Sequence, residues 1–203
     1  WCARTQARCL YILGATYLSR KGYTLSLHDL NVSDKVKKMT DEVIANAEKK
    51  TAEIVKSYES GTLLHVPGKS LEDTREMKIL QVLNEVRTEI AKIVKANFPV
   101  TGNVNKMIQP EAAGSMLNIV QIACGVGQQA LGSKRINFGF TERTLPFFKR
   151  GDLSPDSRGF IKSSFFKGLK PTEFFFASIT GRDSLMDTAL RTPKSGYLYR
   201  RLV

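Results

Sequence analysis

The sequence has few residues of the types that bind metals or form disulfides. Its 203 residues include 3 cysteines and 2 histidines. Cys2, Cys9 and Cys124 form no Cys-x-x-Cys pair and have no histidine at zinc-ligand spacing, and His28 has no second ligand near it in sequence. We therefore expect reduced structural thiols, a structural or surface histidine and no metal site, as in a cytosolic protein.

Long apolar runs are also missing. No stretch of about 18 apolar residues occurs, so we expect no membrane span, and the start of the chain is not a signal peptide. Apolar residues still make up 42% of the sequence, which is enough for a core. The chain opens on Trp1 rather than Met, and a helical pattern continues to Val203, so we expect a piece of a longer polypeptide.

The glycine-rich motifs that bind nucleotide phosphates are absent. The sequence has no Walker motif, and its segment GVGQQALG at residues 125–132 does not open a helix after a strand. We therefore do not expect a nucleotide-binding loop of either common type.

Positive charge is abundant and unevenly distributed. The net charge is +12, and residues 141–203 carry 12 basic against 6 acidic side chains. Such an excess suits a polyanion, for example nucleic acid or a nucleotide. A generic basic protein and a protein with acidic neighbours remain alternatives, because composition does not separate the three.

The pattern of apolar residues predicts a mainly α fold built on a long antiparallel helical hairpin. A first helix is expected over residues 4–19, ending at Gly22. Residues 23–27 alternate as a short strand or extended link. Two patterns of some 25 residues follow, one capped by Ser33 and the other by Ser70 with Asp73 in a capping box. About ten residues join them, so the two helices should pack antiparallel.

The hairpin is followed by a loop-rich helical segment. Residues 99–105 form a link rich in glycine and asparagine, which divides the chain into expected domains at 1–98 and 99–203. A helix capped by Ser115 is expected over residues 116–130, with Gln128 and Gln129 at its end. These two amides are either satisfied capping groups or part of a functional surface.

The last stretch, residues 171–203, predicts one long helix of roughly 50 Å. Pro171-Thr172-Glu173 is a helix start, with Thr172 as the expected cap. Apolar residues point all around the cylinder, so the helix must be enclosed by other protein. It is also basic, and Gly181, Pro193 and Gly196 weaken its interior. Two short core helices broken at Pro193 are the alternative, and the pattern alone does not decide.

The residues of this stretch resemble a known family. GRDSLMDTALRTPKSGYLYRRLV (Gly181–Val203) is similar to the bridge helix in the largest subunit of multisubunit DNA-directed RNA polymerases, of the archaeal and eukaryotic type. Residues Gly114–Phe148 and Ser157–Phe176 resemble the segments before it, and RKGYTLSLHDL (Arg20–Leu30) with the hairpin resembles the funnel region. The resemblance covers nearly the whole chain and leans archaeal.

The resemblance implies a polymerase fragment that lines the nucleotide entry channel and supports the template strand during RNA synthesis. It places Gln128 and Gln129 in the pore wall. It implies that the template and active site are lined by Thr188, Arg191, Thr192, Pro193, Gly196, Tyr197 and Arg200. For Arg191, an ion pair with Asp183 or Asp187 on the same helix is the alternative role, with Asp187 at i,i+4.

The resemblance also implies a catalytic centre outside this chain. In the family three aspartates hold the catalytic Mg²⁺, and this sequence has no Asp-x-Asp-x-Asp cluster, so neither a catalytic residue nor a metal ligand is expected here. The implied partners are DNA template, RNA, nucleoside triphosphates, other polymerase subunits, especially the second-largest, and cleavage factors at the funnel. The implied location is the cytoplasm beside the nucleoid, or the nucleus in a eukaryote. A free-standing basic module that binds nucleic acid and a purely structural hairpin are the alternatives.

Two positions depart from the family, Ala113, where members usually carry lysine or arginine before Gly114-Ser115, and Pro193. Where this chain has Pro193, members commonly carry alanine or another small residue, and positions 192 and 193 are implied to face the template base. Proline removes a backbone hydrogen bond to the carbonyl of Ala189 and costs about 3 kcal/mol in a helix interior. We therefore expect the helix to bend or open locally at residues 189–193.

Overall fold

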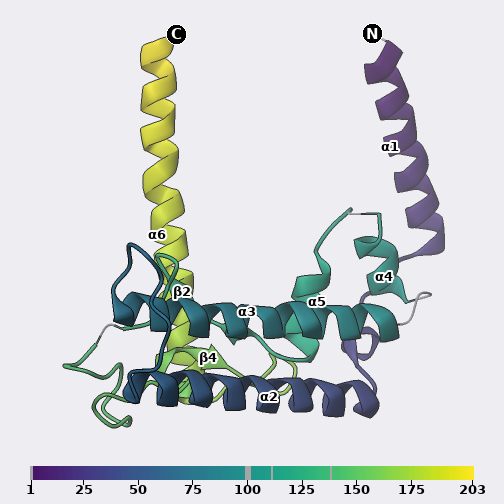
Figure 1. Cartoon of the computed structure of the whole chain (residues 1–203). Coiled ribbons are helices and arrows are strands. Elements are labelled where there is room, and N and C mark those ends of the chain that lie inside the picture. The colour runs from purple at the N-terminus through teal and green to yellow at the C-terminus, as the bar shows by residue number, and fades with distance from the viewer. Residues whose placement is uncertain (1, 99–101, 111, 138) are drawn as a thin grey trace. The chain divides into compact units, whose positions relative to one another are not determined.

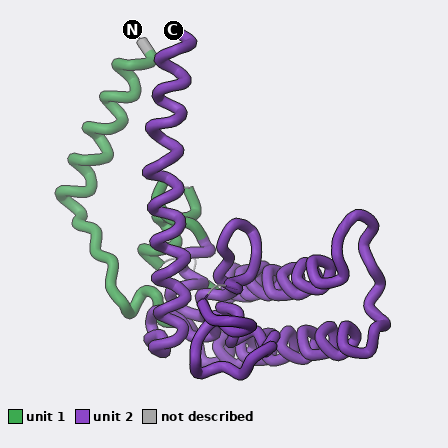
Figure 2. The backbone as a smooth tube through the Cα atoms, turned by 90° about the vertical axis from the view of Figure 1, so that its left-hand side faces the viewer, with its two compact units in different colours: residues 1–31, 98–115 green, residues 32–97, 116–203 purple. Residues whose placement is uncertain are grey.

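The computed structural model describes residues 2–98, 102–110, 112–137 and 139–203, and it confirms a mainly helical fold. The chain forms two compact units (Figure 2). Unit 1 contains residues 1–31 and 98–115, and unit 2 contains residues 32–97 and 116–203. Part of the expected link, residues 99–101, lies outside the described residues. The functional division at residues 98 and 99 stays a prediction.

Unit 1 contains the first helix and a short one that is distant in sequence. Helix α1 (Cys2–Lys21) ends at Gly22, whose φ of +73° and hydrogen bond to the Leu18 carbonyl, 2.8 Å, confirm the predicted cap. An extended link rather than a strand leads to a 3-10 turn at Leu27–Leu30. Helix α4 (Asn103–Ile108) begins inside the stretch that we expected to be a link. The Tyr23 hydroxyl donates to the Asn103 carbonyl at 2.7 Å, which ties the two segments of the unit together.

The apolar side of α1 is exposed. Leu10, Leu13, Tyr17 and Leu18 each have at least half of their surface accessible. The described part of the chain therefore supplies no cover for this face.

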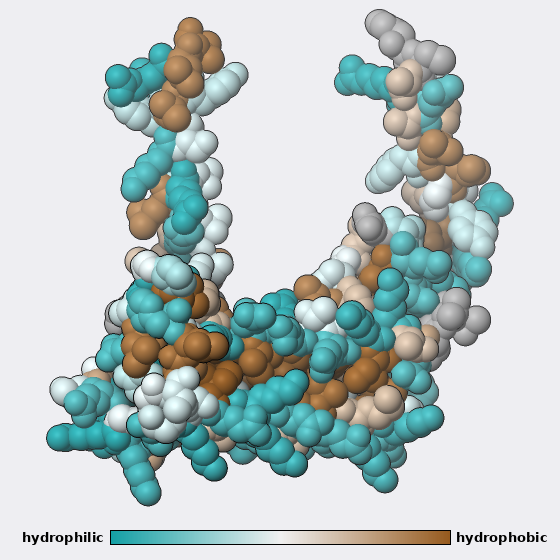
Figure 3. Space-filling model, in the orientation of Figure 1, coloured by the Kyte–Doolittle hydropathy of each residue, from teal (hydrophilic) through white to brown (hydrophobic). Residues whose placement is uncertain are grey.

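Unit 2 is built on the predicted hairpin. Helices α2 (Asp34–Glu59) and α3 (Leu71–Asn97) lie side by side and are joined by residues 60–70 (Figure 1). Hydrophobic side chains form a band along their seam, with hydrophilic ones outside (Figure 3). The buried apolar residues recur at helical spacing on both helices: Val36, Ile44, Ala47, Ile79, Leu83, Val86, Ile90 and Val94. The Asp73 amide donates to the Ser70 hydroxyl at 3.0 Å, which confirms Ser70 as the cap, and this hydroxyl in turn donates to the Asp73 carboxylate at 2.8 Å.

The helix expected over residues 116–130 is shorter than predicted. Helix α5 (Met116–Ala123) ends where the amides of Cys124 and Gly125 both bond to the Val120 carbonyl. The chain then turns away, because the Val126 amide donates to the carbonyl of Ser163 at 3.2 Å. Strand β1 (Gly127–Gln128) pairs antiparallel with β4 (Phe160–Ile161), so Gln128 lies in a strand rather than at a helix end.

A second small hairpin follows and packs on α3. Strands β2 (Ala130–Leu131) and β3 (Lys134–Arg135) pair antiparallel, with Ala130 opposite Arg135. A loop then leads through a 3-10 turn at Asp156–Arg158 to Gly159, whose φ is +89°. A side chain at residue 159 would approach Ile136 to 2.8 Å, so this turn favours glycine. The loops thereby carry buried Ile136, Phe160 and Ile161 into the core.

The last element is a single helix, α6 (Pro171–Leu202), of 32 residues. It continues through Pro193 without changing type, and its ribbon is one unbroken helix (Figure 1). The alternative of two short helices broken at Pro193 is therefore wrong, whereas the expected local bend at residues 189–193 stays a prediction. Lys170 rather than Thr172 occupies the N-cap position, with Pro171 as the first helical residue. None of the described helices combines the length and the apolarity needed to cross a membrane.

Candidate nucleic-acid interface

Helix α6 is fixed at its first turn by a buried carboxylate. Glu173 accepts hydrogen bonds from three backbone amides, those of Lys170 at 2.9 Å, Lys162 at 3.2 Å and Ser163 at 3.4 Å. Burial raises the pKa of Glu173, but these donors outweigh burial and hold its pKa below the ordinary value. An ionised carboxylate thus joins the helix start to the end of β4.

Aromatic packing completes the anchor. Phe176 is 2% exposed, and its ring stacks on that of Phe148 with centroids 6.5 Å apart. Helix α6 also contacts β2. Beyond Thr180 the situation changes, because every residue from Gly181 to Val203 is exposed. Helix α6 is therefore held at one end and projects from its own unit (Figure 2).

All seven residues implied to line the template lie on this projecting part. Thr188, Thr192, Gly196 and Arg200 are four residues apart, which places them along one side of the helix. The Thr188 and Thr192 hydroxyls donate to carbonyls one turn earlier, Ser184 at 2.9 Å and Thr188 at 3.0 Å. Their oxygens still have capacity to accept a hydrogen bond. Tyr197 is partly covered by Arg201, whose guanidinium carbon lies 5.7 Å from the ring centroid.

The charge of the projecting part is strongly positive. Five cationic residues face two acidic ones: Arg182, Arg191, Lys194, Arg200 and Arg201 against Asp183 and Asp187. Arg191 Nε donates to Asp187 Oδ1 at 2.8 Å, and this bond raises the pKa of Arg191. Within the described part of the chain, no carboxylate lies within ion-pair distance of Arg182, Lys194 or Arg200. Hydrophobic side chains lie between these charges (Figure 3), so the surface combines both kinds of contact.

The glutamine pair lies on a different element. The Gln128 amide nitrogen donates to the carbonyls of Gln129 at 2.7 Å and Arg158 at 2.9 Å. Its Oε1 atom is buried and has no partner among the described residues. The Gln129 backbone amide donates to the Gly159 carbonyl at 2.9 Å. The structure thus does not bring the glutamines together with the seven exposed residues of α6.

A metal centre does not emerge from the described residues, which contain no group of three or more His, Cys, Asp or Glu side chains able to hold an ion. We therefore derive no chemical step through a metal on this chain.

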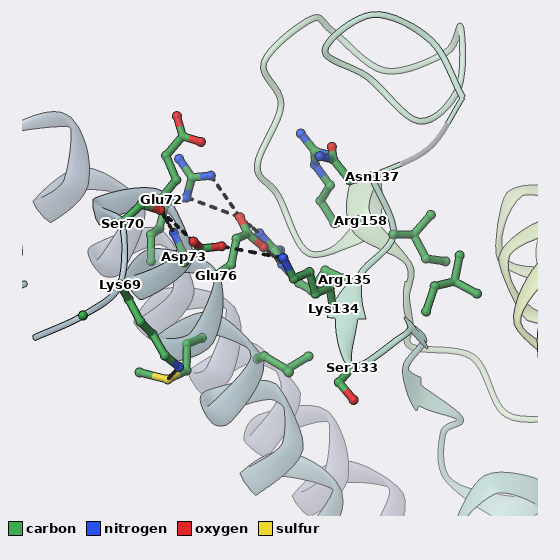
Figure 4. A pocket seen from close by; sticks show the side chains of 16 residues that line it. Lys69, Ser70, Glu72, Asp73, Glu76, Ser133, Lys134, Arg135, Asn137 and Arg158 are labelled. Atoms are coloured by element: carbon green, nitrogen blue, oxygen red, sulfur yellow. Dashed lines mark hydrogen bonds and ion pairs between the residues drawn. The ribbon is translucent and has the colours of Figure 1, made fainter. Parts of the chain in front are cut away.

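The structure also brings together charged residues that the sequence patterns did not single out. Arg75 and Glu76 on α3, Arg135 on β3 and Arg158 after the long loop meet at one cavity (Figure 4). No sequence signal links them, since they come from three segments and Glu76 and Arg135 are 59 positions apart.

Comparison with known proteins identifies the family of this chain. The chain matches the family model of RNA polymerase Rpb1, domain 4, over residues 54–161, and that of RNA polymerase Rpb1, domain 5, over residues 168–203. The first match alone covers more than half of the chain. The chain therefore belongs to the RNA polymerase Rpb1 family, and the resemblance found in the sequence is confirmed.

Several curated relatives share this assignment and are archaeal. The chain is 44% identical to DNA-directed RNA polymerase subunit Rpo1N of Methanothermobacter thermautotrophicus over 90% of its length, covering 21% of that protein. It is 40% identical to the Rpo1N subunit of Thermoplasma acidophilum over 94% of its length, covering 22% of that protein. For the Rpo1N subunit of Halococcus morrhuae the identity is 42% over 90% of the chain, and the coverage of that protein is 52%. The chain thus spans from about a fifth to about half of these relatives.

Proposed function

We propose that this chain is the part of a DNA-directed RNA polymerase largest subunit that runs from the funnel to the bridge helix. In this role it lines the nucleotide entry channel and supports the template strand during RNA synthesis. The observation that carries the proposal is the projecting part of α6, a continuous basic helix exposed along its whole length. Its apolar and cationic side chains are mixed, as required to contact both protein and phosphate.

The catalytic step itself belongs to other parts of the enzyme in this proposal. Nucleotidyl transfer joins the RNA 3′-hydroxyl to the α-phosphate and releases pyrophosphate, with Mg²⁺ held by residues outside this chain. This chain would position the template through Arg191, Arg200 and the small residues between them. Its partners would be template DNA, RNA, nucleoside triphosphates, the second-largest and other subunits, and cleavage factors at the hairpin, in the cytoplasm.

The free-standing module and the structural hairpin are not favoured. The two matched Rpb1 domains follow one another along residues 54–161 and 168–203, as in one continuous subunit. A structural hairpin would also have no use for an exposed basic helix attached at one end.

The proposal is tested in polymerase assembled with the complete subunit. Arg191→Gln with Arg200→Gln should reduce the salt resistance of elongation complexes, because each arginine removed from a phosphate lowers the slope of log affinity against log salt by about 1. The matched control is Lys49→Gln with Lys50→Gln, two exposed lysines on α2. Equal salt profiles for the two double variants would contradict a role of α6 at the template.

A further inference from the structure

A second charged site lies away from α6. A cavity of about 690 Å³ opens between the start of α3 and the β2–β3 hairpin (Figure 4). Its lining includes five cationic side chains and three acidic ones. This volume is within the range of small-molecule sites.

The inner wall has more guanidinium groups than carboxylates. Glu76 accepts from Arg135 at 2.7 Å and 3.0 Å, and the same carboxylate accepts from Arg75 at 3.1 Å. The Arg135 side chain is 1% exposed. Arg75 lies 4.3 Å from the centroid of the Tyr58 ring, which orients its plane. One carboxylate is therefore paired with two arginines, which leaves one positive charge in excess.

Arg158 adds a third guanidinium with neutral partners. The residue is 8% exposed, and it donates to the Asp152 carbonyl at 3.2 Å and to the Asn137 side-chain oxygen. Within the described residues, no carboxylate is within ion-pair distance of it. Burial lowers the pKa of Arg158, Glu76 opposes this, and the positive charges of Arg135 and Arg75 lower the pKa further. A buried charge without a charged partner is costly, so this wall is suited to an anion.

We propose that this cavity binds a small phosphate-bearing anion, with Arg158 as its inner contact and Lys69 and Lys134 as contacts at the rim. Guanidinium groups bind phosphate oxygens in a planar fork, and exposed lysines add point charges. Among the described residues, Lys134 is held only by a 3.8 Å pair with Asp73, with 81% of its side chain exposed, so a phosphate can replace that partner. Met77, Leu80 and Leu131 give the cavity an apolar side for the rest of a ligand. The proposal does not rest on the polymerase function.

The test measures binding of inorganic phosphate to the assembled complex by titration calorimetry, in EDTA and at constant ionic strength. EDTA removes anion binding that depends on divalent metals. The variant R158M should bind phosphate roughly tenfold more weakly than the parent, since methionine cannot form the charged hydrogen bond. Because R158M alters a buried side chain, K69Q/K134Q gives an independent test with exposed residues and the same direction of change. K49Q/K50Q on α2 should bind like the parent.

Two further titrations identify the source of the phosphate group. A nucleoside monophosphate that binds at least tenfold more tightly than phosphate, while the unphosphorylated nucleoside does not bind, assigns the site to nucleotides. Equal affinities for the two phosphate compounds assign it to the free anion. The proposal is overturned if the parent binds no phosphate, or if both variants bind it as the parent does. It is also overturned if R158M causes another subunit to dissociate from the complex while the affinity of the complex for phosphate is unchanged. Arg158 then pairs with a carboxylate of that subunit rather than with phosphate.

Discussion

On the projecting part of α6, Arg191 Nε and Asp187 Oδ1 are 2.8 Å apart and form an ion pair across one helical turn. Both side chains are more than half exposed, at 79% and 54%. The pair that the sequence offered as an alternative role for Arg191 is therefore present. A pair this exposed is weak and exchangeable, so it is compatible with transfer of Arg191 to a phosphate when nucleic acid is bound.

The two roles of Arg191 predict different results in the assembled polymerase. If Arg191 transfers to the template, Arg191→Gln should lower the salt slope of elongation complexes by about 1, whereas Asp187→Asn should leave the slope unchanged. Asp187→Asn should also raise the affinity slightly, because it removes both a competitor for Arg191 and a negative charge near the DNA. Salt titration of stalled complexes measures both effects. Parent-like profiles for both variants would show that the pair acts only within the helix.

Pro193 should weaken α6 locally although the helix continues through it. Proline has no N–H, so the Ala189 carbonyl lacks its partner four residues on. Pro193→Ala should restore that bond and stabilise the helix by up to about 3 kcal/mol. Slower hydrogen exchange at residues 192–197 is the expected readout, together with a changed elongation or pausing rate and little change in nucleotide selection. Ser195→Ala, two residues away, is the matched control.

An elongation rate equal to that of the parent at every nucleotide concentration would remove any kinetic role of Pro193. Unchanged hydrogen exchange would show in addition that the missing bond does not limit the helix.

Glu173 should be essential for the attachment of α6. Glu173→Ala leaves three backbone amides without their acceptor, which should destabilise the chain by about 1–3 kcal/mol. Urea unfolding followed by circular dichroism measures the change. Glu59→Ala, at the exposed end of α2, should alter stability by less than about 0.5 kcal/mol. A Glu173→Ala chain as stable as the parent would contradict the anchor.

The Glu76–Arg135 pair predicts a dependence of stability on pH. Burial raises the pKa of Glu76, but Arg135 and then Arg75 outweigh it and hold the pKa below its ordinary value of 4.5. The stabilisation is therefore complete above pH 4.5 and is lost as the pH falls through the lower, folded-state pKa. Glu76→Gln should cost about 2–3 kcal/mol at pH 7, less than a fully buried pair because Glu76 is 33% exposed.

Glu76→Gln should also flatten the decline in stability below pH 4.5, relative to the exposed control Glu72→Gln one turn earlier. Thermal unfolding between pH 3 and 7 gives both quantities. The same acid slope in Glu76→Gln and in the parent would show that other carboxylates cause the decline.

The sequence was sufficient for elements whose determinants are local. The hairpin of α2 and α3 follows from apolar residues at helical spacing and from the cap at Ser70, and both are present as predicted. The start of α6 at Pro171 also follows from local signals. The same signals did not decide whether the helix would break at Pro193. It continues because the energetic cost of one proline is smaller than that of ending a long helix.

The failures involve partners that are distant in sequence. Helix α5 ends early because the amide of Val126 donates a hydrogen bond to the carbonyl of Ser163. No sequence pattern near residue 126 predicts that acceptor. The cavity formed around Arg158 is hidden for the same reason. The apolar residues around α6 predicted that other protein encloses the helix; the described chain contains nothing that covers them, so this enclosure stays a prediction.

The central claim is that the projecting part of α6 lies against the template strand in an RNA polymerase. A photo-crosslinking amino acid at position 192, in polymerase assembled with the complete subunit on a labelled scaffold, tests it most directly. The same probe at Lys49 on α2 is the control. We predict a crosslink from position 192 to the template within a nucleotide or two of the base that pairs with the incoming substrate, and none from position 49. Crosslinks from position 192 to protein alone, in complexes that still elongate RNA, would contradict the account.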